Sequence, residues 1–168
     1  MQRMSVTDHV TGLFQTARNP MNIGGLLLFE VPPEQRDQFA ARIAAHLAAR
    51  LPASPLARRL VRSPEDFDAP AWFRVSAERA MAGLNHDPVA PLLTPAALRE
   101  RVKARAMEPI DTARLPFELD IYDQVEGPHC ALFLKQHHTC MDGIGYQQLI
   151  ELLSDQGGLV IPRALLVE

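Results

Sequence analysis

The amino-acid sequence predicts an α/β (α+β) fold in which a mixed β-sheet is flanked by helices. Three patterns support this class. Apolar residues recur every four positions from Phe39 to Leu51, which is typical of an amphipathic helix. Apolar and polar residues alternate over residues 117–122, and after a turn residues 130–134 are almost entirely apolar. This favours a hairpin whose second strand lies deep in the sheet. A helical pattern at residues 149–153 follows a polar loop.

The first half of the chain begins with a helix start signal. Residues 5–8 have the form of a capping box, so we expect a short opening helix that stops at Asn19. Residues 24–31 are apolar on both faces, which suits a strand buried between layers. Residues 52–91 carry many prolines and a broken pattern, so we expect irregular structure around short elements near Trp72.

The second half has clearer signals. Thr94 followed by Pro95 is a good helix start, and the helix should end before Pro109. Residues 126–128, Glu-Gly-Pro, form the turn of the predicted hairpin. Residues 159–168 are expected to be a small closing strand or a tail.

Composition limits the range of functions. The chain has 168 residues, of which 47% are hydrophobic and 22% charged, and this suits one compact domain with its own core. Its net charge of -3 provides no broad basic field, so we expect no nucleic-acid partner. Arginines cluster at residues 58–62 and 99–105, where they could face an anionic ligand or a membrane surface. Such runs are more often solvated helix faces, which is the interpretation we prefer.

The cysteines and apolar runs indicate the compartment. Cys130 and Cys140 are too few for a disulfide framework and lack the paired spacing of a zinc site, so we expect a reducing compartment and no metal. The start of the chain lacks signal-peptide character. The longest strongly apolar run, residues 23–29, is far shorter than the roughly 20 residues of a spanning helix. We therefore expect a cytoplasmic protein with at most peripheral membrane contact.

His137 and His138 follow the second strand of the hairpin, at a sheet edge of the kind where α/β proteins bind ligands. Adjacent residues leaving a strand point to opposite sides, so one imidazole should face a cleft and the other the interior. Asp142, with Gly143 permitting a tight backbone, could fold back to bond a histidine nitrogen or an arginine. Such a bond would fix the tautomer of a general base.

Other interpretations of this segment stay open. The histidines could be strand-end residues with satisfied hydrogen bonds. A metal site would need further ligands, and His129, Cys130 and Cys140 form no recognisable set. Cys140 could be a nucleophile activated by a histidine, although its apolar neighbour Met141 favours a buried small hydrophobe.

Residues 137–143, His-His-Thr-Cys-Met-Asp-Gly, resemble the His-His-x-x-x-Asp-Gly motif of the chloramphenicol acetyltransferase-like superfamily. Residues 4–8 with 20–24, and residues 109–118, resemble segments of the wax ester synthase/diacylglycerol acyltransferase family in particular. The resemblance implies that residues 1–158 are the N-terminal half-domain of such an acyltransferase, a chloramphenicol acetyltransferase-like sandwich.

This resemblance also implies a reaction. A fatty acyl group would move from acyl-CoA, a co-substrate rather than a bound cofactor, to a long-chain alcohol or diacylglycerol. His138 would be the general base, and His137, Asp142 and Gly143 would be the other motif residues of the catalytic site. Asp142 would be an orienting acid that pairs with an arginine, for which Arg114 is a candidate. The alternatives are a condensation-type or polyketide-ester acyltransferase with a carrier-bound donor, and a non-catalytic half-domain.

Two departures from the family bear on partners and substrates. Residues 115–117, Leu-Pro-Phe, stand where the family usually has Pro-Leu-Trp, so substrate preference does not carry over. Family members are usually well over twice as long, with a second, similarly folded half after the motif. The resemblance therefore implies a separate C-terminal half chain or self-association. Peripheral contact with a membrane or lipid droplet would suit the lipid substrates.

Overall fold

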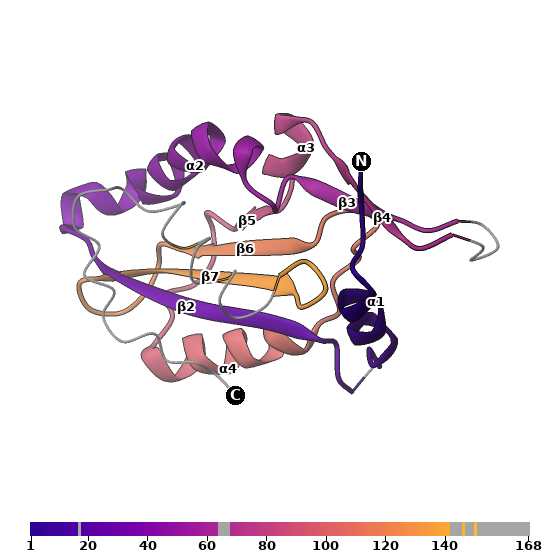
Figure 1. The fold of residues 1–168 in the computed structure, drawn as a ribbon. Helices are drawn as coiled ribbons and strands as arrows, with labels where there is room; N and C mark the ends of the chain where they lie inside the picture. The colour runs from indigo at the N-terminus through magenta and orange to yellow at the C-terminus, as the bar shows by residue number, and fades with distance from the viewer. Residues whose placement is uncertain (17, 64–67, 142–145, 147–149, 151–168) are drawn as a thin grey trace.

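The computed structural model describes residues 1–16, 18–63, 68–141, 146 and 150. In this part of the chain, a four-stranded sheet of order β2-β7-β6-β5 forms the centre of the fold (Figure 1). Its strands are β2 (Asn22–Glu30), β5 (Leu84–His86), β6 (Phe117–Tyr122) and β7 (His129–His137). β5 and β6 pair in parallel and the other pairings are antiparallel, so the sheet is mixed, as the sequence predicts.

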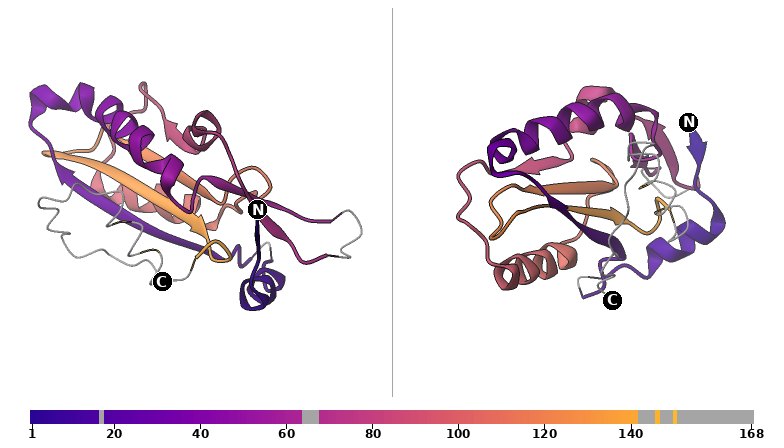
Figure 2. Two further views of the ribbon diagram at one scale, coloured as in Figure 1. Left: turned by 45° about the horizontal axis from the view of Figure 1, so that its top comes forward. Right: turned by 90° about the vertical axis from the view of Figure 1, so that its left-hand side faces the viewer.

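Helices cover both faces of this sheet (Figures 1 and 2). α2 (Phe39–Arg50) lies on one face and α4 (Pro95–Met107) on the other. β6 serves both layers because its side chains alternate. Leu119 packs into the apolar cluster that contains α2, whereas Asp120 bonds Arg105 of α4. The predicted class, a mixed sheet flanked by helices, is confirmed.

A second, smaller sheet has the order β1-β4-β3 among the described residues. Its strands are β1 (Gln2–Arg3), β3 (Arg58–Val61) and β4 (Ala71–Arg74). The remaining elements are the helices α1 (Val6–Leu13) and α3 (Ala77–Met81) and the 3-10 helices η1 (Pro33–Gln38) and η2 (Leu51–Ala53).

Residues 52–91 are more ordered than the sequence predicts. β4 lies at the expected place near Trp72, but β3, α3 and β5 were not predicted. These three elements have only three to five residues each, which is too short for a periodic pattern to show. β3 is defined by its pairing with β4, and β5 by its pairing with β6.

β2 lies at an edge of the described sheet rather than in its interior. The prediction of two apolar faces is correct, since Leu27 packs with the α2-side cluster and Leu26 with the α4-side cluster. The strand is less buried than predicted, because Gly25 alone is buried along it and Leu28 is 43% exposed. β7 takes the deep position, as predicted for the second strand of the hairpin.

The predicted helix starts are confirmed by side-chain caps. Ser5 Oγ accepts a hydrogen bond from the Asp8 N–H at 3.0 Å, and Thr94 Oγ1 accepts one from the Ala97 N–H at 3.1 Å. α4 ends before Pro109, as expected.

Most of the chain after Met141 lies outside the described residues. Within 142–168 the structure describes only Tyr146 and Ile150, and both are helical. The predictions for Asp142, Gly143 and residues 159–168 fall in the undescribed part.

Candidate active site

The end of β7 places the two histidines at an edge of the sheet, where main-chain bonds hold the following turn. The His137 N–H donates to Pro116 O at 2.8 Å, and the His138 N–H donates to Met21 O at 2.7 Å. The Cys140 N–H donates back to His137 O at 2.9 Å and closes the turn. Met21 has a φ of 55°, in the left-handed region that favours glycine, so the backbone is strained where it accepts the His138 bond.

The His137 side chain is built into the fold. It is 2% exposed, and its Nδ1 lies 2.7 Å from Thr139 Oγ1 and accepts from the Thr139 N–H at 3.2 Å. Because Nδ1 accepts, the ring proton is on Nε2, which donates to Gln15 Oε1 at 3.2 Å. Burial lowers the pKa of His137 to about 4, and the charges of His138 and Arg62 act in the same direction. His137 is therefore neutral at physiological pH.

The His138 side chain has different surroundings. It is half-buried, and no hydrogen bond joins its imidazole to another side chain of the residues that the structure describes. His137 is thus bonded to neighbouring residues through both of its ring nitrogens. His138, by contrast, is half-buried and is bonded through its ring to no side chain of the described residues.

Arg58 is the arginine that reaches the motif turn. It lies on β3, and its guanidinium donates to Cys140 O at 2.5 Å and lies 3.4 Å from Cys140 Sγ. The same group stacks on Trp72, 4.6 Å from the ring centroid, and donates to Gln2 Oε1 at 3.1 Å. Arg114, the candidate from the sequence, instead donates to Ala82 O at 3.3 Å. Arg58 therefore ties the motif turn to the small sheet.

The surroundings of Cys140 do not favour a nucleophile. Both Cys140 and Cys130 are buried and free. Burial raises the pKa of the Cys140 thiol, and this effect outweighs the opposing influence of Arg58. Because the thiolate is the reactive form, Cys140 is poorly suited to attack a substrate.

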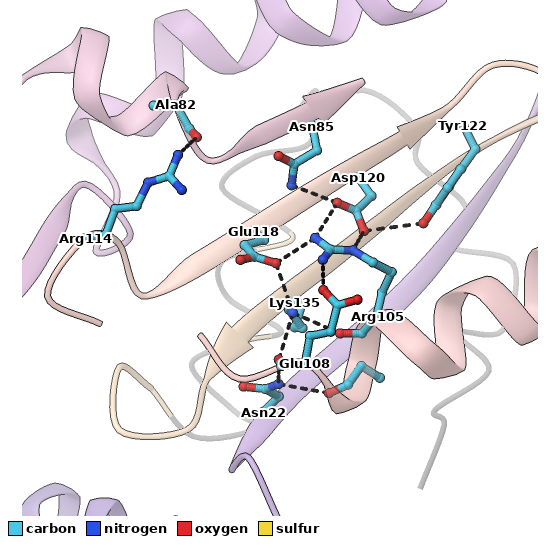
Figure 3. A network of polar contacts seen from close by, with 11 residues as sticks. Asn22, Ala82, Asn85, Arg105, Glu108, Arg114, Glu118, Asp120, Tyr122 and Lys135 are labelled. Atoms are coloured by element: carbon cyan, nitrogen blue, oxygen red, sulfur yellow. Dashed lines mark hydrogen bonds and ion pairs between the residues drawn. The ribbon is translucent and has the colours of Figure 1, made fainter. Parts of the chain in front are cut away.

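An ion network between α4 and the sheet adds structure that the sequence did not predict (Figure 3). Arg105 of α4 binds both carboxylate oxygens of Asp120, at 2.8 and 3.0 Å, and Glu118 at 2.7 Å. The hydrogen bond to Asp120 raises the pKa of Arg105 more than any other contact. Lys135 is 1% exposed, pairs with Glu118 at 2.9 Å, and donates to the carbonyls of Arg105 and Glu108 at 2.9 and 3.0 Å.

The last turn of α4 is also fastened to β2. Asn22 Nδ2 donates to Ala106 O at 2.9 Å and Glu108 O at 2.8 Å (Figure 3). These bonds satisfy carbonyls that a helix end leaves without intrahelical partners. In the sheet, Asn22 is the register partner of His137. The helix end is thus attached directly beneath the histidine turn.

The interpretation of both arginine clusters as solvated helix faces is wrong for Arg58 and Arg105. Arg58 lies on a strand, and Arg105 turns toward the sheet. A signal for Arg105 was available, because the polar face of the predicted strand at 117–122 carries the acidic residues Glu118 and Asp120. No comparable signal marked Arg58, whose partner is 82 positions away.

A cavity of about 470 Å³ lies at the other end of the sheet. Tyr122 lines it and pairs with Ala131 in the sheet, whereas the histidines follow the opposite end of β7. His86 and Asp123, whose Nε2 and Oδ2 atoms are 2.7 Å apart, also line this cavity. It is therefore separate from the histidine turn.

Within the described ranges, no three His, Cys, Asp or Glu side chains are grouped so that they could hold a metal ion. Among helices in that part of the chain, none has both the length and the apolar character needed to cross a bilayer.

Comparison with solved structures identifies the fold of this chain. A wax ester synthase/diacylglycerol acyltransferase from Marinobacter aquaeolei VT8 matches with a TM-score of 0.73 and 22% identity, over 89% of this chain and 37% of that chain. The first condensation domain of the calcium-dependent antibiotic synthetase, in complex with a substrate analogue, matches with a TM-score of 0.64 and 15% identity, over 90% and 36%. A variant of the starter condensation domain of rhizomide synthetase, in complex with C8-CoA, gives 0.61 and 13%, over 90% and 34%. The fold is that of the chloramphenicol acetyltransferase-like proteins.

The sequence narrows this class to a family. The model of the wax ester synthase/diacylglycerol acyltransferase catalytic domain matches residues 4–158, and the chain belongs to this family of O-acyltransferases. A curated relative, the O-acyltransferase WSD of Acinetobacter baylyi, is 26% identical over 160 residues, which are 90% of this chain and 32% of that protein. The chain spans about a third of the length of these relatives.

Proposed function

We propose that this chain is the N-terminal half of an enzyme that transfers a fatty acyl group from acyl-CoA to a long-chain alcohol or diacylglycerol, with His138 as general base. The observation that carries the proposal is the unequal pair at the end of β7. His137 is buried and bonded through both nitrogens, whereas the half-buried His138 ring has no hydrogen-bonded side chain among the described residues. A base must be reachable by the hydroxyl that it deprotonates, and the half-buried His138 fits this requirement better than the buried and bonded His137.

The proposed step is a direct transfer between two bound substrates. A ring nitrogen of His138 takes the proton of the acceptor hydroxyl as the oxygen attacks the thioester carbonyl. The tetrahedral intermediate collapses, the C–S bond breaks, and the imidazolium returns the proton to the leaving thiolate. The products are an ester and free CoA, and no acyl group is attached to the protein. Base catalysis of this kind contributes about 10² to 10⁴ in rate.

Family membership and one neighbour of the same fold support the reaction class and the donor. Family membership supports O-acyl transfer, and a condensation-domain relative of the same fold was solved with C8-CoA. We further propose that a partner, either a C-terminal half chain or a second copy, supplies the remaining wall of the site. Peripheral contact with a membrane or lipid droplet would bring the enzyme to its lipid acceptors.

A second candidate follows from the condensation-domain neighbours, namely acyl transfer from a carrier-bound donor. The folds match with TM-scores of 0.61 to 0.64. The two candidates share the histidine base and differ only in what holds the acyl group. A non-catalytic half-domain is the remaining alternative.

The test is an acyl-transfer assay on the purified chain together with any partner that copurifies, with its mass measured by sedimentation. Radiolabelled palmitoyl-CoA and palmitoyl-carrier protein are the two donors, and hexadecanol and a diacylglycerol are the acceptors. His138→Ala should lower transfer at least about a hundredfold. His129→Ala is the matched control, because His129 is a half-buried histidine at the other end of the same strand. Full activity of a folded His138→Ala protein would refute the assignment.

A further inference from the structure

The residues after α1 lie against the turn that carries the histidines (Figure 1). A Cβ atom on Gly12 would come within 3.2 Å of Thr139 Cγ2, so α1 and the turn are in close contact. Three residues further on, Gln15 Oε1 lies 3.2 Å from His137 Nε2. This contact joins positions 122 residues apart in the sequence.

Gln15 faces the proton-bearing nitrogen of a buried ring. The Thr139 N–H donates to His137 Nδ1, so that nitrogen carries no proton and Nε2 carries the one N–H of the neutral ring. The Gln15 amide oxygen accepts from that N–H. A buried N–H without an acceptor would be costly, so this bond favours the observed orientation of the ring.

We infer that Gln15 is a positioning residue, which holds His137 as the neutral Nε2–H tautomer so that the adjacent His138 can accept a proton. The effect on His138 rests on the proposed function, whereas the tautomer of His137 does not. An amide oxygen accepts the Nε2–H without adding charge, whereas a carboxylate in its place would stabilise imidazolium. A protonated His137 would disfavour a second positive charge on His138, because like charges on adjacent rings repel.

The other charged groups near His137 are consistent with a neutral ring. Arg62 and His138 both act against its protonation. On α1, Asp8 is engaged by the hydroxyl of Ser5 at 2.7 Å. Gln15, two residues after the end of α1, is therefore the side chain of this segment that bonds the ring.

The first test is an NMR titration of the histidine side chains in the full chain. In the wild type, His137 should show the neutral Nε2–H tautomer and a pKa lowered to about 4. Gln15→Glu should raise the pKa of His137 by about one unit or more, as an anion within hydrogen-bond distance does. Gln15→Leu should make the Nε2–H exchange faster with water. Gln35→Glu and Gln35→Leu are matched controls, because Gln35 is a glutamine that accepts a side-chain bond from Arg42, and they should change neither signal.

An Nδ1–H tautomer in the wild type, or an unchanged His137 titration in Gln15→Glu, would overturn the assignment of Gln15. The second test is the pH profile of acyl transfer. Gln15→Glu should lose more kcat than the wild type as the pH falls through the raised pKa of His137, with KM unchanged, because a protonated His137 makes the adjacent His138 a weaker base. If the pH profiles of wild type and Gln15→Glu coincide although the pKa of His137 is raised, the positioning role of Gln15 is refuted. A wild type without any transfer would instead refute the proposed function and leave the NMR result intact.

Discussion

Truncation of the two adjacent histidines should affect stability very differently. His137→Ala removes a ring that is 2% exposed and leaves the Thr139 N–H and hydroxyl without their partner. An unsatisfied buried group costs about 1 to 3 kcal/mol, and the cavity left by the ring brings the total to about 3 to 5 kcal/mol. For a chain of 168 residues, each kcal/mol lowers Tm by about 2 to 4 °C, so Tm should fall by about 6 to 20 °C.

His138→Ala should cost far less, because its ring is half-buried and bonds no described side chain. We expect a loss within about 1 kcal/mol, or less than about 4 °C in Tm. Thermal unfolding followed by circular dichroism at pH 7.5 measures both variants, and His129→Ala sets the background for a histidine on β7. Equal losses in the two variants, or a larger loss in His138→Ala, would refute the division into a structural and a catalytic histidine.

Three further outcomes follow from the structure. Cys140→Ser should retain most acyl transfer, and native Cys140 should react slowly with iodoacetamide at pH 7.5 because burial raises its pKa; an acyl group found covalently on Cys140 would contradict direct transfer. The pKa of His137 is lowered to about 4 from 6.5, so the unfolded chain binds the extra proton between these values, and the free energy of unfolding should fall as pH drops through this window. His137→Asn should lose that part of the pH dependence in urea unfolding. Lys135→Met should cost about 2 to 3 kcal/mol in the same measurement, whereas the exposed Lys103→Met should cost less than about 1 kcal/mol.

The sequence predicts the parts of the fold whose patterns are long enough to repeat. The hairpin of β6 and β7 and the helices α2 and α4 each show a period or a cap, and each is present. The order of the strands in the sheet, by contrast, cannot be predicted from such local patterns. β2 is as apolar as a central strand, yet it lies at the edge of the described sheet because β7 pairs on both sides.

Some features of the candidate site could likewise be predicted from local sequence, and others could not. The motif indicates the histidines, and strand alternation indicates that their rings point to opposite sides. Which ring is buried depends on contacts with Gln15 and Thr139, and the first of these comes from the far end of the chain. The contact between Arg58 and Cys140 is equally remote. Pairings of this kind arise from tertiary packing, which a single sequence does not display.

The attachment of the α4 terminus determines which part of the enzyme can move. Lys135 and Asn22 fasten the last turn of the helix to β7 and β2, beside the strand position of His137. Displacing this end of β7 from α4 would therefore break the Lys135–Glu118 ion pair and the side-chain bonds to the helix carbonyls together, so we expect this half to stay rigid during turnover. The motion that admits two lipid substrates and releases an ester would then come from the opposing wall. Under the proposed function, a partner chain that closes the site would thus also control substrate entry.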